Sequence, residues 1–171
     1  PLKVLGEDRP VIFYDQLGCG NSDRPDDLSL WTMDRFVQEL HLLREALGFD
    51  WCHILGHSWG TMLGMDYYLT HPDGIASLIQ SSPCISIERW VADCNNYRKQ
   101  LPPEVQKVMD KHEAAGTTES EEYRDAEKEF NKRHVLRLDT VPEAVLKGRQ
   151  QRGKVVYDTM WGPSEFFITG T

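Results

Sequence analysis

The sequence predicts an α/β protein built on a parallel sheet. Three short apolar runs, at residues 11–14, 51–55 and 77–81, have the length and composition of buried strands. Helical patterns separate them, over about residues 32–47 and 59–69. Alternating strands and helices are typical of right-handed βαβ units, whose strands are neighbours in one parallel sheet. We therefore expect three strands in the first half of the chain.

The first helical pattern is amphipathic and has defined ends. Thr32 can cap its amino terminus, and Asp34 suits the positive first turn. Gly48 is a natural stop, because glycine readily adopts the left-handed conformation that ends many helices. The apolar positions recur at helical spacing, which predicts one face on the sheet: Phe36, Val37, Leu40, Leu43 and Leu47.

The pattern changes after Cys84, where helical periodicity and charged residues replace the strand signals. Pro102 and Pro103 are expected to open one helix, and Pro142 another. Thr118 and Glu121 have the spacing of a capping box for a further helix. The predicted organisation is a partial α/β core at residues 1–84, a helical cap at residues 85–167, and the start of a return to the core at residues 168–171.

Composition and charge exclude several classes of partner. The chain carries a net charge of −8 with a pI of about 5.2, so nucleic acid is not an expected partner. No apolar run is long enough to span a membrane, and neither a metal-ligating cluster nor a phosphate-binding fingerprint is present. We expect no membrane, metal or cofactor. The four cysteines show no Cys-x-x-Cys spacing and predict free thiols in a cytoplasmic protein: Cys19, Cys52, Cys84 and Cys94.

The strongest chemical signal is Gly-His-Ser-Trp-Gly at residues 56–60. It matches the nucleophile elbow, in which a serine occupies a strained turn between a strand and a helix. Ser58 is then the nucleophile, and the backbone N–H of Trp59 belongs to the oxyanion hole. Glycine at both flanks would remove side chains that collide where strand and helix meet. Because a strand pattern precedes the motif and a helix pattern follows it, the sequence predicts an α/β-hydrolase fold and a serine hydrolase.

A serine hydroxyl needs a base, and this fold orders its triad as Ser, then Asp or Glu, then His. His112 and His134 follow Ser58 at sufficient distance, but both lie in charged helical segments and are better explained as surface residues. His57 is inside the elbow and is expected to point away from the serine hydroxyl. None of these histidines is a convincing base. With only three strands predicted, we expect the chain to be truncated at both ends, marginally stable and inactive alone.

Three segments give the chain a family resemblance: residues 13–22, residues 56–62, and residues 157–166 with the sequence Tyr-Asp-Thr-Met-Trp-Gly-Pro-Ser-Glu-Phe. Together they resemble the proline iminopeptidases, serine aminopeptidases that include the tricorn-interacting aminopeptidase. The resemblance covers essentially the whole chain, and its third segment is the most specific. It implies the release of an N-terminal residue, often proline, from short peptides with a free N-terminus or from aminoacyl amides.

The resemblance also implies roles for individual residues. Ser58 matches the nucleophile and Trp59 the oxyanion residue. Glu165 matches a cap carboxylate that holds the substrate's amino group, which suits charge-assisted hydrogen bonding. Tyr157 matches a tyrosine near that pocket, and it or Trp161 could pack against a proline ring. The alternatives are that Glu165 is a carboxylate at a helix start after Gly162-Pro163 and that Trp161 only packs in the cap.

The family's upstream His-Gly-Gly-Pro loop has no match here, and its catalytic Asp, second amine-binding Glu and catalytic His would follow Thr171. Two other functions stay open. An amidase or esterase of the same fold would use Ser58 but not Glu165. A non-catalytic protein would bind a ligand in the same cleft and resist labelling at Ser58. The oligomeric state is not indicated.

Overall fold

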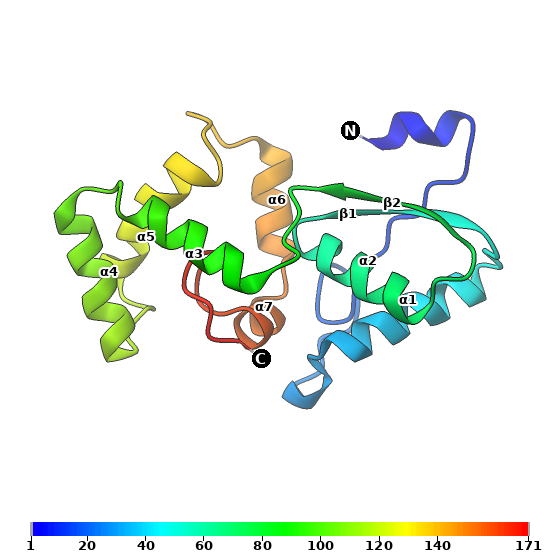
Figure 1. Ribbon diagram of the computed structural model, residues 1–171, viewed down its shortest axis with the longest axis horizontal. Coiled ribbons are helices and arrows are strands. Elements are labelled where there is room, and N and C mark those ends of the chain that lie inside the picture. Colours follow the sequence, from blue (N-terminus) through cyan, green and yellow to red (C-terminus); the bar gives the residue numbers. More distant parts are fainter. Residues whose placement is uncertain (1, 171) are drawn as a thin grey trace.

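A computed structural model of the chain describes residues 2–170. Figure 1 shows the strands β1 and β2 with the helices α1 and α2 at one end of the molecule, the helices α3, α4 and α5 at the other, and α6 and α7 between them. Short 3-10 helices, η1 at Leu2–Glu7 and η2 at Leu28–Leu30, precede α1. Within residues 2–170 no helix is both long and apolar enough to cross a membrane.

Two of the three expected strands form the sheet. The strands β1 (Cys52–His57) and β2 (Ile75–Ser81) pair in parallel, with His57 opposite Ser81. Helix α2 (Trp59–Thr70) connects them, which is the predicted βαβ unit.

The strand predicted at residues 11–14 is wrong. This segment has no regular secondary structure, and Ile12 and Phe13 are exposed. A strand exists only where a neighbour supplies backbone hydrogen bonds, and the described residues offer none along this segment. A β-rich apolar run was therefore not enough to predict a strand.

Helix α1 (Met33–Ala46) has the predicted ends. The Thr32 hydroxyl accepts from the N–H of Arg35 at 3.2 Å, and Gly48 has a φ of 68° just beyond the helix. Leu47 is exposed, so the apolar face is shorter than expected. Phe36, Val37 and Leu40 pack in what we call the sheet cluster, which also contains residues of α2. Its buried members are Trp31, Phe36, Val37, Leu63 and Tyr67.

Five helices follow the sheet: α3 (Ile87–Arg98), α4 (Pro103–Ala115), α5 (Glu121–His134), α6 (Glu143–Gln151) and α7 (Lys154–Met160). Prolines precede or begin α4 and α6, as expected. The predicted capping box of Thr118 and Glu121 is wrong. Ser120 caps α5 by accepting from the N–H of Tyr123 at 3.2 Å, because it directly precedes the helix while Thr118 lies in the turn.

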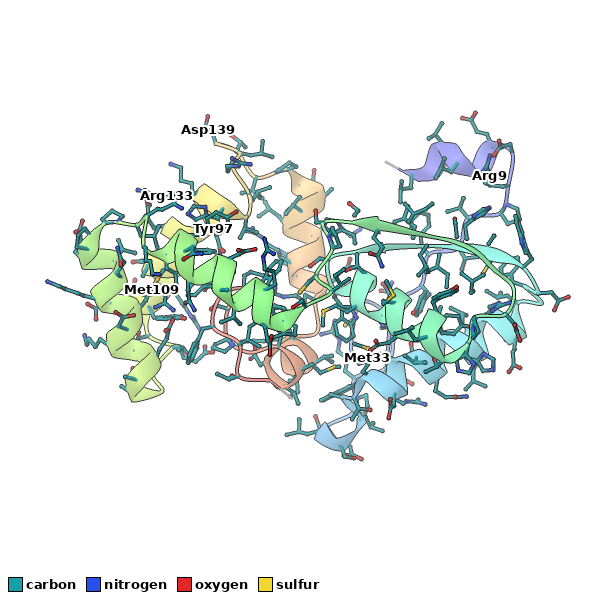
Figure 2. The ribbon with its side chains drawn as sticks, viewed as in Figure 1. Arg9, Met33, Tyr97, Met109, Arg133 and Asp139 are labelled. Atoms are coloured by element: carbon teal, nitrogen blue, oxygen red, sulfur yellow. The ribbon has the colours of Figure 1, made fainter. Side chains whose placement is uncertain are left out.

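The second packing centre, here called the helix cluster, lies among α3, α4, α5 and the segment after α7. Figure 2 labels one of its members, Met109 on α4, which is fully buried. The buried members are Cys94, Leu101, Met109, Tyr123, Ala126, Phe130 and Phe166. Helix α7 instead packs Val156 and Met160 against the sheet cluster. The chain after α7 thus runs from one packing centre to the other.

Candidate active site

Ser58 lies between β1 and α2 in a conformation that non-glycine residues rarely adopt, with φ 51° and ψ −117°. Backbone hydrogen bonds hold it on both sides. Its N–H donates to the Ser81 carbonyl at 3.0 Å, and its carbonyl accepts from the N–H of Thr61 at 2.8 Å. The Ser58 side chain makes no capping hydrogen bond to α2. This is the strained strand-to-helix turn that the motif predicted.

The two glycines of the elbow have different roles. A Cβ on Gly56 would lie 2.1 Å from the Gly60 carbonyl oxygen, so the strand and the helix can meet only with glycine there. A Cβ on Gly60 would meet nothing within 4 Å. The expectation that both flanking glycines prevent a collision is therefore right for Gly56 and wrong for Gly60.

Ser58 opens into a cavity of about 170 Å³. The cavity lies at the carboxyl end of β1, where parallel sheets commonly bind ligands. Its lining combines the elbow, the helix α7 and the segment that follows α7. All five residues predicted from the motifs lie on it: Ser58, Trp59, Tyr157, Trp161 and Glu165. The structure thus brings together residues that are up to 107 positions apart in the sequence (165 − 58).

Two side chains of α3 contact the backbone carbonyl of Glu165 and hold it in place. Its carbonyl accepts from the indole N–H of Trp90 at 2.7 Å and faces the Cys94 thiol at 3.9 Å. On either side of it, Ser164 and Phe166 are buried. With both neighbours anchored, the Glu165 side chain is directed to the cavity that it lines.

A polar network extends this anchoring to α4 and α5. The Tyr123 hydroxyl donates to Glu113 at 3.0 Å and lies 3.4 Å from the Ser164 hydroxyl. Arg98 pairs with Glu113 at 2.9 Å, and both side chains are nearly buried. The Arg98 guanidinium also lies 5.4 Å from the centre of the Phe166 ring. The segment carrying Glu165 is therefore held by three helices.

Among the described residues, the Glu165 carboxylate has one weak ionic partner. Arg152 approaches it at 3.9 Å and lies over the Tyr157 ring at 4.1 Å. Burial raises the pKa of the Tyr157 phenol, and the negative charge of Glu165 raises it further. Tyr157 thus stays neutral and can donate a hydrogen bond. Glu165 lies in a bend after α7, so the alternative that it begins a helix is wrong.

The tryptophans that line the cavity also connect different parts of its wall. Trp161 packs edge-to-face on Trp90, with ring centres 5.8 Å apart, and it lines the cavity as well. Its indole N–H is buried without a partner in the described structure. The Trp59 indole donates to the Gln16 side chain at 3.0 Å, which ties the loop at residues 15–22 to the elbow.

Several residues of the lining were missed by sequence reasoning. Gln16 and Cys19 belong to the segment at residues 13–22, which carried the resemblance but gave no role to either. Trp90 and Arg152 lie in helical patterns that resemble any surface helix, so no local signal identified them.

No histidine in the described part of the chain hydrogen-bonds the Ser58 hydroxyl. His57 pairs its Nδ1 with the Ser81 hydroxyl at 3.1 Å and not with the Ser58 hydroxyl, as expected. His112 is buried against Thr117 and Glu122, and His134 stacks on Tyr97. The interpretation of His112 as an exposed helix histidine is wrong, because its ring is tied into the turn between α4 and α5.

The four cysteines are free thiols, as predicted. Cys84 and Cys94 are buried, whereas Cys19 and Cys52 are partly exposed. Residues 2–170 contain no group of three or more His, Cys, Asp or Glu side chains arranged to hold a metal ion.

Comparison with known proteins places this geometry in a family. The sequence profile of the α/β-hydrolase fold matches residues 2–140. The chain belongs to the α/β-hydrolase fold family. A proline iminopeptidase of Heyndrickxia coagulans is 51% identical over 170 residues, which are 99% of this chain and 59% of that protein. A proline iminopeptidase of Lactobacillus acidophilus is 40% identical over 96% of this chain and 57% of its own length. The resemblance stated from the motifs is confirmed.

Solved structures agree with the fold. The crystal structure of VinJ superposes with a TM-score of 0.86 at 37% identity and covers 92% of this chain, which spans 55% of VinJ. The crystal structure of the Mycobacterium smegmatis proline iminopeptidase gives a TM-score of 0.77 at 41% identity, over 92% of this chain and 54% of that one. The chain thus spans somewhat more than half the length of the relatives it matches.

Proposed function

We propose that this chain carries the nucleophile and the amine-binding carboxylate of a serine aminopeptidase. The enzyme releases an N-terminal residue, preferentially proline, from short peptides or aminoacyl amides. One observation carries the proposal: Ser58 and Glu165 line the same cavity of about 170 Å³, although their neighbours Trp59 and Phe166 pack in different packing centres. The names of the relatives support the substrate class.

In the proposed reaction the Ser58 hydroxyl attacks the carbonyl carbon of the N-terminal residue, and its proton passes to a histidine base that the described residues do not supply. The Trp59 N–H stabilises the negative charge on the carbonyl oxygen. The C–N bond then breaks, and the amine leaves with the proton. Water hydrolyses the acyl-enzyme, which frees Ser58 and the amino acid.

In this proposal Glu165 selects the substrate. A half-buried carboxylate with one weak ionic partner binds an ammonium group by charge-assisted hydrogen bonds. The neutral Tyr157 hydroxyl lies beside it, and Trp161 offers an apolar face to the proline ring. An ester substrate without a free amine gains nothing from Glu165, and this difference supplies the test.

The test compares Glu165→Gln with the parent on prolyl p-nitroanilide and on p-nitrophenyl acetate, using the protein as its gene encodes it. We expect kcat/KM for the prolyl substrate to fall by roughly 10²-fold, since a buried charged hydrogen bond contributes about 2–3 kcal/mol, while ester hydrolysis stays within twofold. Glu88→Gln, an exposed carboxylate of α3, is the matched control and should change neither.

Other outcomes select the rival functions. If Glu165→Gln lowers both activities equally, Glu165 does not anchor an amine, and an amidase or esterase is the better description. If Ser58 resists a fluorophosphonate probe and Ser58→Ala leaves ligand binding intact, the protein is a non-catalytic binder.

We propose in addition that residues 1–84 are part of the catalytic core, that residues 85–167 form its cap, and that residues 168–171 begin the return to the core. The two packing centres support this division, although α7 contributes to the first of them. The four free cysteines support a cytoplasmic location, and the net charge of −8 disfavours a nucleic-acid partner.

A further inference from the structure

Thr61 is the most completely buried polar residue beside the elbow, with an exposed fraction of 0%. Its hydroxyl donates to the Ser58 carbonyl at 2.6 Å and accepts from the N–H of Cys84 at 3.1 Å. These directions are fixed, because a carbonyl can only accept and an N–H can only donate. One hydroxyl therefore connects the nucleophile's backbone to the segment that follows β2.

A residue with a strained backbone lies at one end of this connection and another lies two residues before its other end. Ser58 at φ 51° and Ser82 at φ 49° are the two non-glycine residues with positive φ in the described chain. They follow the neighbouring strands β1 and β2, and the Ser58 N–H donates to the carbonyl of Ser81, one residue before Ser82. Such conformations persist only where the surrounding contacts over-determine them. Thr61 supplies a contact to Ser58 and a contact just beyond Ser82, at Cys84.

The connection also reaches the cavity wall. Cys84 is buried and lines the cavity together with Ser58. The Ser58 carbonyl receives two donors, the N–H and the hydroxyl of the same Thr61, which occupy both of its lone pairs. Rotation of Ser58 out of its strained conformation would break both bonds at once.

We propose that Thr61 is a positioning residue for the nucleophile. Its hydroxyl holds Ser58 in the strained turn and keeps Cys84, on the cavity wall, at a fixed distance from Ser58. Thr61 does not touch the substrate and acts through Ser58. The inference builds on the proposed serine chemistry but not on the choice of an aminoacyl substrate.

The test uses Thr61→Val, which keeps the shape and removes the hydroxyl, and Thr61→Ser, which keeps the hydroxyl. Thr70→Val is the matched control, because the Thr70 hydroxyl also donates to backbone carbonyls of α2, those of Asp66 and Tyr67, but at the opposite end of the helix. The three variants are made in the full-length protein that the gene encodes. The readouts are kcat and KM per titrated active site, the rate of Ser58 labelling by a fluorophosphonate, and the urea midpoint.

For Thr61→Val we expect kcat and the labelling rate to fall about tenfold, the effect of losing roughly one hydrogen bond, with KM within twofold. Thr61→Ser should recover most of both, and Thr70→Val should match the parent. A loss of activity that only follows the folded fraction, or a failure of Thr61→Ser to rescue, would overturn the proposal. If aminoacyl substrates are not turned over at all, the proposed function fails, and the labelling rate alone still decides the role of Thr61.

Discussion

The indole N–H of Trp90 on α3 donates to the backbone carbonyl of Glu165 at 2.7 Å. This bond joins a helix of the second half of the chain to the residue that we propose to bind the substrate's amino group. It fixes the main chain of Glu165 while leaving the carboxylate free in the cavity. Trp90 also packs on Trp161 and lines the cavity, so it supports the site from two directions.

Trp90→Phe keeps an aromatic ring but removes the donor. We expect KM for prolyl p-nitroanilide to rise roughly fivefold, because about 1 kcal/mol of anchoring is lost and Glu165 is less well placed. Hydrolysis of p-nitrophenyl acetate should be unchanged. Trp51→Phe, at a tryptophan that is 65% exposed before β1, serves as the control. An equal loss on both substrates would show that Trp90 supports the whole cavity and not Glu165.

Gly56→Ala tests the close approach at the elbow. The new Cβ would lie 2.1 Å from the Gly60 carbonyl oxygen, so the backbone must move, and we expect a loss of about 2–3 kcal/mol in the free energy of unfolding. Gly60→Ala meets no atom within 4 Å and should be neutral or stabilising by about 0.5–1 kcal/mol, since alanine favours helices. Urea unfolding followed by circular dichroism measures both. Equal destabilisation would contradict the different roles of the two glycines.

Arg98→Met tests the ion pair behind the Glu165 segment. The substitution leaves the nearly buried Glu113 without its ionic partner, although the Tyr123 hydroxyl still donates to it, and this should cost about 3 kcal/mol of unfolding free energy. Arg89→Met removes an exposed pair with Asp93 on the same helix and should cost no more than about 0.5 kcal/mol. If the two variants unfold at the same urea concentration, the network does not stabilise α3 and α4.

Because Tyr14 is partly buried, we expect the protein to lose stability at alkaline pH. Burial, reinforced by the negative charge of Glu39, raises its pKa to about 12, against about 10 in an unfolded chain. Because the folded state holds the phenolic proton more tightly, the stabilisation is complete below pH 10 or so and disappears as the pH rises toward 12. Urea midpoints measured across this range should fall less steeply for Tyr14→Phe than for the parent. Parallel curves would show that Tyr14 does not contribute.

The elements that local chemistry determines were predictable from the sequence. The strands at β1 and β2, the helix between them and the cap of α1 follow from periodicity, from Thr32 and from the glycines. The elbow at Ser58 was predictable because its glycine spacing reflects a specific steric need. The strand at residues 11–14 was not, since a strand depends on a partner that local sequence does not describe.

The site was predicted through resemblance more than through physics. Glu165 and Trp161 have no local feature that marks a binding role, and only the specific segment at residues 157–166 drew attention to them. Their neighbours are Trp90, on the amphipathic helix α3, and Arg152, which directly follows α6, so their approach to the cavity is a result of tertiary packing. Thr61 likewise gave no signal beyond its place in the elbow segment.

Ser58 lies beside the sheet cluster, whereas Phe166, next to Glu165, is buried in the helix cluster. This separation has a consequence for how such proteins diversify. If Glu165 binds the substrate's amino group as we propose, substitutions among α3, α4 and α5 would shift its carboxylate and so alter substrate choice, while leaving Ser58 and the elbow unchanged. To change selectivity, one would therefore randomise Ser164 and the residues of the helix cluster, including Phe166, and keep the sheet cluster unchanged.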